Sequence, residues 1–234
     1  MSLKEEEVYF SGKDHTFPLH IHERIVAGFV SSGKVILSFE EEFYELSSGD
    51  AYVIFPFTPH SAKTFDEAAI AVITFAQNSD MLCRTRKKYL ILKDIAVKYP
   101  SIYKNNIPDA AFIEKILIEQ AEPSYLFKET DSERIRNIIS ENYSEKNTLE
   151  DVSVCGKSRF SVLRSFRKDF GVTPSVYQIL VRIRKAKLMM LDGRSLIDTA
   201  LDCGFCDQSH FNRTFKKYTG LTPEEFRNKT MRSN

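Results

Sequence analysis

The side chains best suited to recognise DNA lie near the end of the chain, at helical spacing. Amide, hydroxyl and guanidinium groups can pair with base edges in the major groove, and ammonium groups suit phosphates. Residues with these groups are Gln208, Ser209, Asn212, Arg213, Lys216 and Lys217. An earlier basic set comprises Arg159, Arg164, Arg167 and Lys168. Such charge runs are often only a solvated face, but here the two sets belong to a repeat.

The repeat is visible in the letters of the sequence. RSFRKDFGVTPSVY begins at Arg164 and RTFKKYTGLTPEEF begins at Arg213, which is an offset of 49 residues. A repeat at this period indicates a supersecondary unit that is used more than once. In each copy an apolar stripe predicts a helix, glycine ends that helix, and Thr-Pro begins the next one.

The surrounding pattern predicts two helix-turn-helix units. A short helix, a glycine turn and a second helix form such a unit, and the second helix fits the major groove. Two units held by one rigid helix could enter successive major grooves about 34 Å apart on one face of DNA. The predicted helices are 132–144, 149–154, 159–170, 175–191, 196–203 and 207–218.

The charge distribution agrees with a polyanion partner for the second half of the chain. The whole chain has a net charge of +1. Residues 1–80 contain 5 Lys and Arg against 13 Asp and Glu, whereas residues 131–234 contain 19 against 13. An acidic first part and a basic last part indicate that only the last part meets nucleic acid.

The cysteines give no disulfide framework. Cys83, Cys155, Cys203 and Cys206 show no repeated spacing, and without a signal peptide we expect reduced thiols in the cytoplasm. The C-x-x-C at Cys203 and Cys206 is compatible with redox or metal chemistry, but a second pair of ligands is missing nearby. We therefore interpret these two thiols as packing around a turn. Since no run approaches the roughly 20 apolar residues of a membrane span, we predict no membrane association.

The segment SLIDTALDCGFCDQSHFNRTFKKYTGLTPEEFRN resembles the second half of the DNA-binding domain of AraC/XylS-type transcription regulators. The resemblance covers residues from about 131 to 229. It implies that bases are read by Phe160, Leu163 and Arg164 in the first unit and by Gln208, Ser209, Asn212 and Arg213 in the second. The apolar Phe160 and Leu163 depart from usual base readout, so they either contact thymine methyl groups or the first unit binds mainly through phosphates.

The basic residues of the linking helix and the phenylalanines of this region are assigned mainly to the structure of the domain. On the linking helix, Arg182, Arg184, Lys185 and Lys187 either contact the DNA backbone or only solubilise the helix. We expect a place in the core for Phe166, Phe205, Phe211 and Phe215.

The first 80 residues have the pattern of a β-rich domain. Short apolar runs are broken by Gly33, by residues 47–50 and by Pro56 and Pro59, and residues 70–75 predict a buried strand. Several short strands at this spacing indicate a sandwich or small barrel. HIHE at 20–23, Gly49-Asp50 and residues 56–60 resemble the two half-motifs of a cupin, which is the usual effector domain of AraC-type regulators.

The cupin resemblance places three histidines together. His20, His22 and His60 stand where metal-binding cupins keep imidazoles, and three imidazoles can hold a divalent metal. The glutamate of that pattern is absent, and Val26 and Ala27 stand there. We predict no cofactor and assign the histidines to an effector pocket or to hydrogen bonds at the barrel end, with a metal site as the alternative.

Residues 81–130 predict a helical middle segment. One helix has an apolar face of Tyr89, Leu90, Leu92, Ile95 and Ala96, and another covers residues 109–121. The family resemblance implies that such helices form a dimer interface. Packing against the barrel is the alternative.

The sequence thus predicts an α+β protein with three parts. They are a cupin-like barrel or sandwich (1–80), a helical linker or dimerisation segment (81–130) and an all-α double helix-turn-helix domain (131–234). The predicted function is a cytoplasmic, sequence-specific DNA-binding transcription regulator and not an enzyme. Expected partners are double-stranded DNA, a small-molecule effector, a second copy of the chain and, for an activator, RNA polymerase. The alternatives are a metal-dependent cupin enzyme fused to a DNA-binding module and a regulator controlled by a protein partner.

Overall fold

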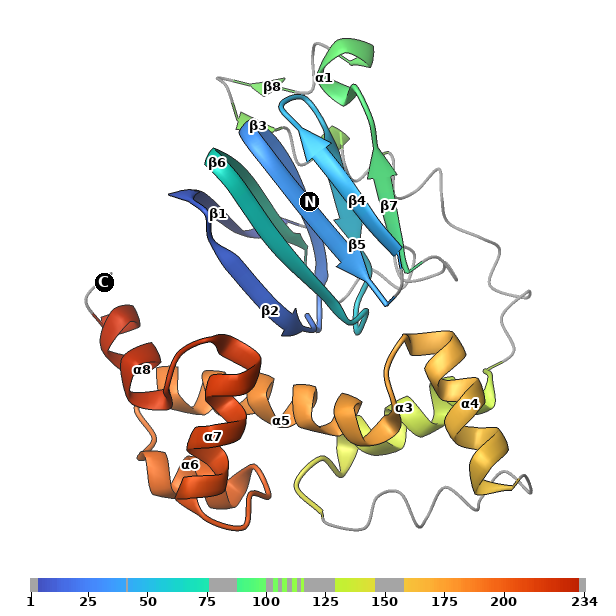
Figure 1. The fold of residues 1–234 in the computed structure, drawn as a ribbon, viewed down its shortest axis with the longest axis vertical. Coiled ribbons are helices and arrows are strands. Elements are labelled where there is room, and N and C mark those ends of the chain that lie inside the picture. The colour runs from blue at the N-terminus through green and yellow to red at the C-terminus, as the bar shows by residue number, and fades with distance from the viewer. Residues whose placement is uncertain are drawn as a thin grey trace. The chain divides into compact units, whose positions relative to one another are not determined.

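The chain forms two compact units, one rich in β-strands and one rich in helices (Figure 1). The computed structural model describes residues 4–40, 42–75, 88–99, 103–104, 107–108, 111–112, 115, 129–145 and 158–231. Within these ranges, every helix is too short or too polar to cross a membrane.

The first unit is built on a seven-stranded sheet. Its strands are β1 (Lys4–Lys13), β2 (Thr16–His20), β3 (Ile25–Phe39), β4 (Glu42–Ser47), β5 (Ala51–Ile54), β6 (His60–Phe75) and β7 (Tyr89–Leu92). The order is β1-β6-β3-β5-β7, while β2 also pairs with β6 and β4 with β3. The two longest strands, β3 and β6, lie side by side and antiparallel (Figure 1). A small separate ladder joins β8 (Tyr103–Lys104) to β9 (Ile107–Pro108).

Both faces of the sheet are buried over the first part of β3 and over β5. Alternate residues of β3, such as Ile25, Ala27 and Phe29, pack in one apolar cluster, and Val30 belongs to another. The continuous apolar run at the start of β3 follows from this burial on two sides. Gly28 lies opposite Tyr52 in the ladder, and a Cβ on Gly28 would lie 2.0 Å from the Tyr52 ring. The glycine therefore makes room for the buried ring.

Gly33 does not break the strand as the sequence pattern predicted. Strand β3 continues through it to Phe39, and the register against β6 shifts between Val30 and Lys34. Gly33 has a φ of 68°, a backbone conformation that glycine adopts without strain. The glycine is therefore part of an irregularity within a long strand.

The prediction of one helix over residues 89–96 was wrong for its first half. Tyr89–Leu92 forms β7, which pairs with β5, and only Ile95 begins a helix, α1 (Ile95–Lys98). The sheet therefore extends beyond residue 80. Most of the second predicted helix, 109–121, lies outside the described residues, but Phe112 packs against the Ile25 cluster.

The helical unit agrees closely with the predicted helices. It contains α3 (Asp131–Glu141), α4 (Arg159–Phe170), α5 (Pro174–Leu191), α6 (Leu196–Asp202), α7 (Gln208–Thr219) and α8 (Pro223–Met231). The hydroxyl or carboxylate of the residue before each helix accepts a hydrogen bond from the N–H three residues later. These caps are Thr130, Ser158, Thr173, Ser195, Asp207 and Thr222. The predicted short helix 149–154 lies outside the described residues.

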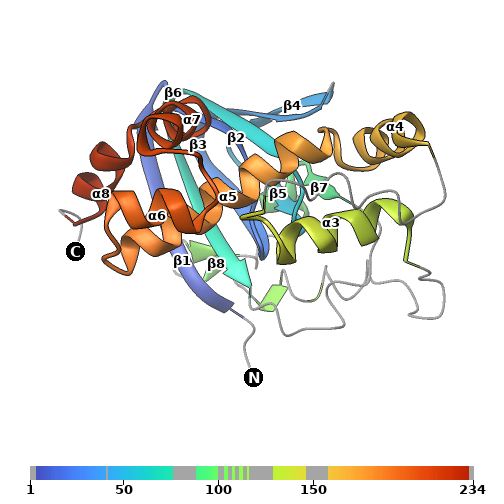
Figure 2. The ribbon, with the colours of Figure 1, turned by 90° about the horizontal axis from the view of Figure 1, so that it is seen from below.

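Helix α5 is the central rod of this unit. It packs against α3 and α4 towards one end and against α6, α7 and α8 towards the other (Figure 2). Phe166 of α4 meets Tyr177 of α5 edge to face, with ring centroids 5.6 Å apart. Phe205, Phe211 and Phe215 are buried around the other end. The predicted core role of the phenylalanines is confirmed.

Candidate DNA-binding surface and histidine cluster

Helices α4 and α7 expose equivalent faces because each lies at the same place in its copy of the 49-residue repeat. Arg164 corresponds to Arg213. Arg167 and Lys168 correspond to Lys216 and Lys217. The opposite faces of both helices are buried, through Val162 and Phe166 on α4 and through Phe211 and Phe215 on α7. Each helix therefore has one face that is fixed by packing and one that is available to a partner.

All eleven predicted DNA-contacting side chains lie on these outer faces. Phe160 is 74% exposed and Leu163 and Asn212 are half-buried. The remaining residues are exposed, namely Arg164, Arg167, Lys168, Gln208, Ser209, Arg213, Lys216 and Lys217. The structure gathers them into two sets, one on each helix, and their contact with DNA stays a prediction.

Some of the basic residues also have a structural use. Arg167 and Lys168 lie in the last turn of α4, and Lys216 and Lys217 lie in the last turn of α7. Cations at this end interact favourably with the helix dipole. Arg164 and Arg213 lie earlier in their helices, so this effect does not account for them.

Arg182 of α5 is not the solvent-facing or DNA-facing residue that the sequence indicated. It is 9% exposed. Its guanidinium donates to the carbonyl oxygens of Tyr143 (2.6 Å), Glu145 (3.0 Å) and Gly204 (2.8 Å). Gln178, one turn earlier, donates to the Tyr143 and Glu145 carbonyls as well. Removal from water lowers the pKa of Arg182, yet an arginine stays charged.

The turn of the second helix-turn-helix unit packs directly on the segment that follows α3. A Cβ on Gly204 would lie 2.1 Å from the carbonyl oxygen of Ser144. Gly204 also has a φ of 75°, which side chains disfavour. Arg182 and Gly204 therefore form a bracket that ties the end of α3, the rod α5 and the turn between α6 and α7 together.

The two thiols of the C-x-x-C differ in their surroundings. Cys203 is buried with its Sγ 3.8 Å from the Sδ of Met189, and Cys206 is exposed. Burial raises the pKa of Cys203 to about 12. Because only the thiolate is nucleophilic, Cys203 behaves as a packing residue, as the sequence indicated. The same prediction was wrong for Cys206, whose side chain is exposed.

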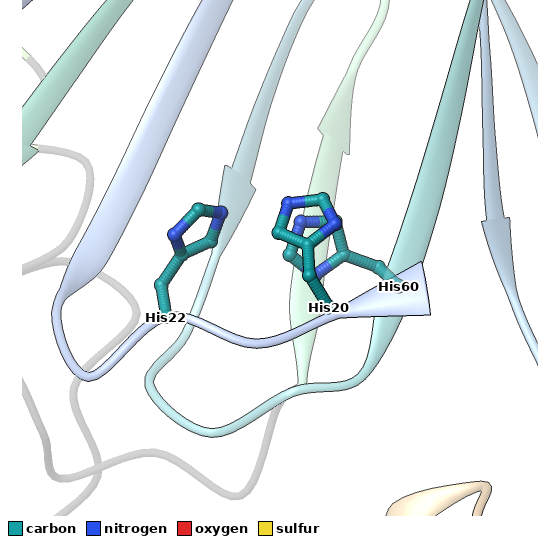
Figure 3. Close-up of side chains that lie close together, drawn as sticks. All are labelled: His20, His22 and His60. Carbon is teal, nitrogen blue, oxygen red and sulfur yellow. The ribbon is translucent and has the colours of Figure 1, made fainter. Parts of the chain in front are cut away.

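The three predicted histidines come together at one end of the seven-stranded sheet. His20 ends β2, His22 lies in the loop towards β3, and His60 begins β6. Their ligand atoms all lie within 4.8 Å of one another. Figure 3 shows His20 and His22 extending upward from their segments and His60 extending sideways toward them. The rings of His22 and His60 have centroids 5.0 Å apart.

Backbone carbonyls orient two of these rings. The Nδ1 of His20 lies 2.7 Å from the carbonyl oxygen of Pro18, and the Nδ1 of His60 lies 2.8 Å from that of Thr58. Within the described residues no carboxylate or thiol joins the cluster. The residues at the expected glutamate position, Val26 and Ala27, are buried in β3.

An aromatic group adjoins the histidines. The ring of Phe39 lies 6.1 Å from that of His60 and stacks on Tyr89 at 3.8 Å. The Tyr89 hydroxyl donates to Glu42 and lies 3.1 Å from the Tyr44 hydroxyl. The sequence reading missed Tyr89, because it placed this residue on a helix.

Comparisons with known proteins agree with the two units. Residues 153–229 match the family described as "Helix-turn-helix domain", and residues 7–75 match the family "Cupin domain". The chain is 27% identical to the uncharacterized HTH-type transcriptional regulator YbfI of Bacillus subtilis, over 89% of this chain and 86% of that protein. It is 22% identical to the probable transcriptional regulator LumQ of Photobacterium leiognathi, over 92% of both.

Among solved structures, the fold is similar to that of ToxT from Vibrio cholerae. The TM-score is 0.64 at 17% identity, covering 95% of this chain and 96% of that chain. Another ToxT structure, at 15% identity, holds an unsaturated fatty acid.

Proposed function

Since this chain is an AraC-type transcriptional regulator with an N-terminal cupin domain, we propose that α4 and α7 are its reading helices and that they dock together on one face of promoter DNA. The observation that supports this most strongly is the repeated outer face. Arg164 and Arg213 occupy equivalent positions on two helices that pack on the same rod. Arginine at such a position can donate two hydrogen bonds to guanine.

The two helices differ in the readout that they can perform. Helix α7 begins with Gln208 and Ser209, which offer hydrogen bonds to bases, whereas α4 presents Phe160 at the position of Ser209. We infer that α7 carries most of the sequence discrimination. Helix α4 adds thymine-methyl and phosphate contacts, together with readout by Arg164.

Selection of binding sequences from random duplexes, followed by gel-shift titration at moderate salt, tests this proposal. The expected result is one preferred site with two half-sites, bound at least 1,000-fold more tightly than unrelated DNA, an order of magnitude typical of specific binding. Equal affinity for all sequences would refute it, because electrostatic attraction to phosphates alone gives no preference.

For the cupin unit we propose a regulatory and not an enzymatic role, with a small-molecule effector. ToxT, whose fold is similar, has been solved with a fatty acid, which supports a small apolar ligand as the class of effector. A ligand shifts the population of domain arrangements only if it binds the arrangement that binds DNA and the arrangement that does not with different affinities. The test is a change in DNA affinity on addition of the candidate effector.

The remaining proposals concern the cellular location, the oligomeric state and a protein partner. We propose that the protein acts in the cytoplasm as a homodimer through residues 81–130, and that it contacts RNA polymerase if it activates transcription. Sedimentation of the purified chain with and without DNA tests the dimer.

A further inference from the structure

We propose that helix α6 opens locally from the helical unit and that docking on DNA holds it closed. The local opening follows from the packing of α6 itself, whereas its closure by DNA rests on the proposed function. Helix α6 is then the element of the second helix-turn-helix unit whose population of open and closed forms is shifted by DNA.

Helix α6 buries a hydroxyl group in the middle of its packed face. Thr199 is completely buried, with 0% of its surface exposed. Within the part of the chain that the structure describes, its Oγ1 has no hydrogen-bond partner. A hydroxyl in this position loses its hydrogen bonds to water and gains none in return. Because this cost applies only while α6 is packed, it favours an open form in which water reaches Oγ1.

The apolar side chains of α6 contribute little to its packing. Ile197 and Leu201 are each 57% exposed. The buried residues of this helix are Thr199 and Ala200, and Leu196 is half-buried. By contrast, α7 buries two phenylalanine side chains completely. Since local stability follows the apolar contacts that an element makes, we expect α6 to open at a lower cost in free energy than α7.

The two connections of α6 differ in how firmly the structure holds them. On the side of α5, Gly193 has a φ of 84°, and a Cβ there would meet nothing within 4 Å. The Arg194 side chain forms an ion pair with Asp202 at 3.4 Å, but an exposed pair of this kind adds little stability. On the side of α7, Gly204 packs directly against the Ser144 carbonyl. We therefore expect α6 to move about the turn at Gly204 while α7 keeps its place.

Docking on DNA favours the closed form of α6. In a helix-turn-helix unit the first helix crosses the DNA backbone while the second lies in the major groove, and α6 is the first helix of the second unit. A ligand that binds one of two forms better shifts the population towards that form. A duplex that contacts α6 in its packed position therefore reduces the time that this helix spends open.

Amide hydrogen exchange of the full-length chain, followed by mass spectrometry of its peptides, tests both the opening and the closure. In the wild type without DNA, amides of α6 should exchange faster than those of α7, and low urea concentrations should change the α6 rate little, because a local opening exposes little surface. Thr199→Val removes the unpaired hydroxyl, so α6 should exchange at least about 5-fold more slowly and Tm should rise. The preferred duplex should slow exchange of α6 in the wild type.

Thr219→Val is the matched control. The hydroxyl oxygen of Thr219 lies 2.8 Å from the Phe215 carbonyl oxygen and accepts a hydrogen bond from the Leu221 N–H at 3.2 Å. This variant should lower Tm and should not slow exchange in α6.

Equal exchange of α6 and α7 in the wild type overturns the local opening, and so does a Thr199→Val variant whose α6 exchanges as fast as that of the wild type. Closure by DNA is overturned if a duplex that binds in the gel-shift titration leaves exchange of α6 unchanged. A chain that prefers no duplex at all shows instead that the proposed function has failed.

Discussion

The guanidinium of Arg182 donates a hydrogen bond to the carbonyl oxygen of Gly204 across 2.8 Å, and thereby joins the central rod α5 to the turn of the second helix-turn-helix unit. The same side chain reaches the Tyr143 and Glu145 carbonyls beyond the end of α3. One buried cation on α5 therefore holds the turn that precedes α7 and the segment that follows α3.

Arg182→Gln should loosen this bracket. Three carbonyl groups lose a charged donor, and the expected loss in free energy of unfolding is about 2–4 kcal/mol. If the bracket positions the reading helices, affinity for the complete site falls more than affinity for the isolated half-site read by α7. Urea unfolding and fluorescence anisotropy measure the two effects. Equal losses on complete and half sites would assign Arg182 to stability alone.

Gly204→Ala tests the packing of the turn, and Gly193→Ala is its matched control. Both glycines have positive φ, 75° and 84°, but a Cβ at Gly193 meets nothing within 4 Å. We expect about 1 kcal/mol of destabilisation at Gly193 from backbone strain alone. At Gly204 the clash with the Ser144 carbonyl adds to this strain, for a total of about 3 kcal/mol or more. Similar Tm values for the two variants would contradict the described contact.

Asp50 makes the free energy of unfolding of the sheet-rich unit depend on pH in the acid range. Burial by itself would raise the Asp50 pKa, but hydrogen bonds from Lys93 and from the N–H groups of Ser47 and Asp94 outweigh it, so the pKa lies below 3.8. A depressed carboxyl pKa gives stability that is present above the unfolded-state pKa and is lost as the pH falls through the folded-state pKa. Asp50→Asn should cost about 1–3 kcal/mol at pH 7, and the difference should shrink below about pH 4. Urea unfolding at several pH values measures it, and a constant difference would refute the assignment.

The thiols of the C-x-x-C should differ in reactivity. Cys206 is exposed and should be alkylated within minutes by iodoacetamide at neutral pH, whereas the raised pKa and burial of Cys203 should protect it until the protein unfolds. Peptide mapping by mass spectrometry distinguishes the two sites, with urea-unfolded protein as the control. Rapid labelling of both in the native protein would disprove the packing role.

Local and non-local features differ in how well the sequence predicted them. The helices of the second half could be predicted because each begins with a cap and α4 and α7 end with glycine, within a few residues of chain. The strand β7 could not, since Tyr89–Leu92 is extended only because β5 pairs with it. Short apolar segments leave helix and strand undecided until their partner is known.

The same contrast between local and non-local determinants holds for the site residues. The outer faces of α4 and α7 follow from helical periodicity, and the predicted contact residues are exposed except for Leu163 and Asn212, which are half-buried. Their contact with DNA stays a prediction. Arg182 was missed because an arginine on a helix ordinarily reaches solvent, and its three acceptors come from residues 22 to 39 positions away. The histidines were grouped only by resemblance to cupins, and the backbone carbonyls that orient His20 and His60 became evident only in the structure.

Arg213→Ala and Lys216→Ala should separate base reading from phosphate binding. Loss of Arg213 should cost about 1–3 kcal/mol on the preferred site and relax the choice at one base pair. Loss of Lys216 should weaken all sequences alike and reduce the salt dependence by about one phosphate contact. Binding-site selection with each variant gives the result, and an unchanged preference for Arg213→Ala would make it a phosphate contact instead.

Docking of α4 and α7 on the same face of one duplex is tested most directly by changing the distance between their half-sites. Gel-shift titration would compare the selected site with one that carries about 5 extra base pairs, half a helical turn, between the half-sites. Because α5 holds the two helices at a fixed separation, affinity for the lengthened site should fall to that of a single half-site. Unchanged affinity would show that the two helices do not dock as a pair.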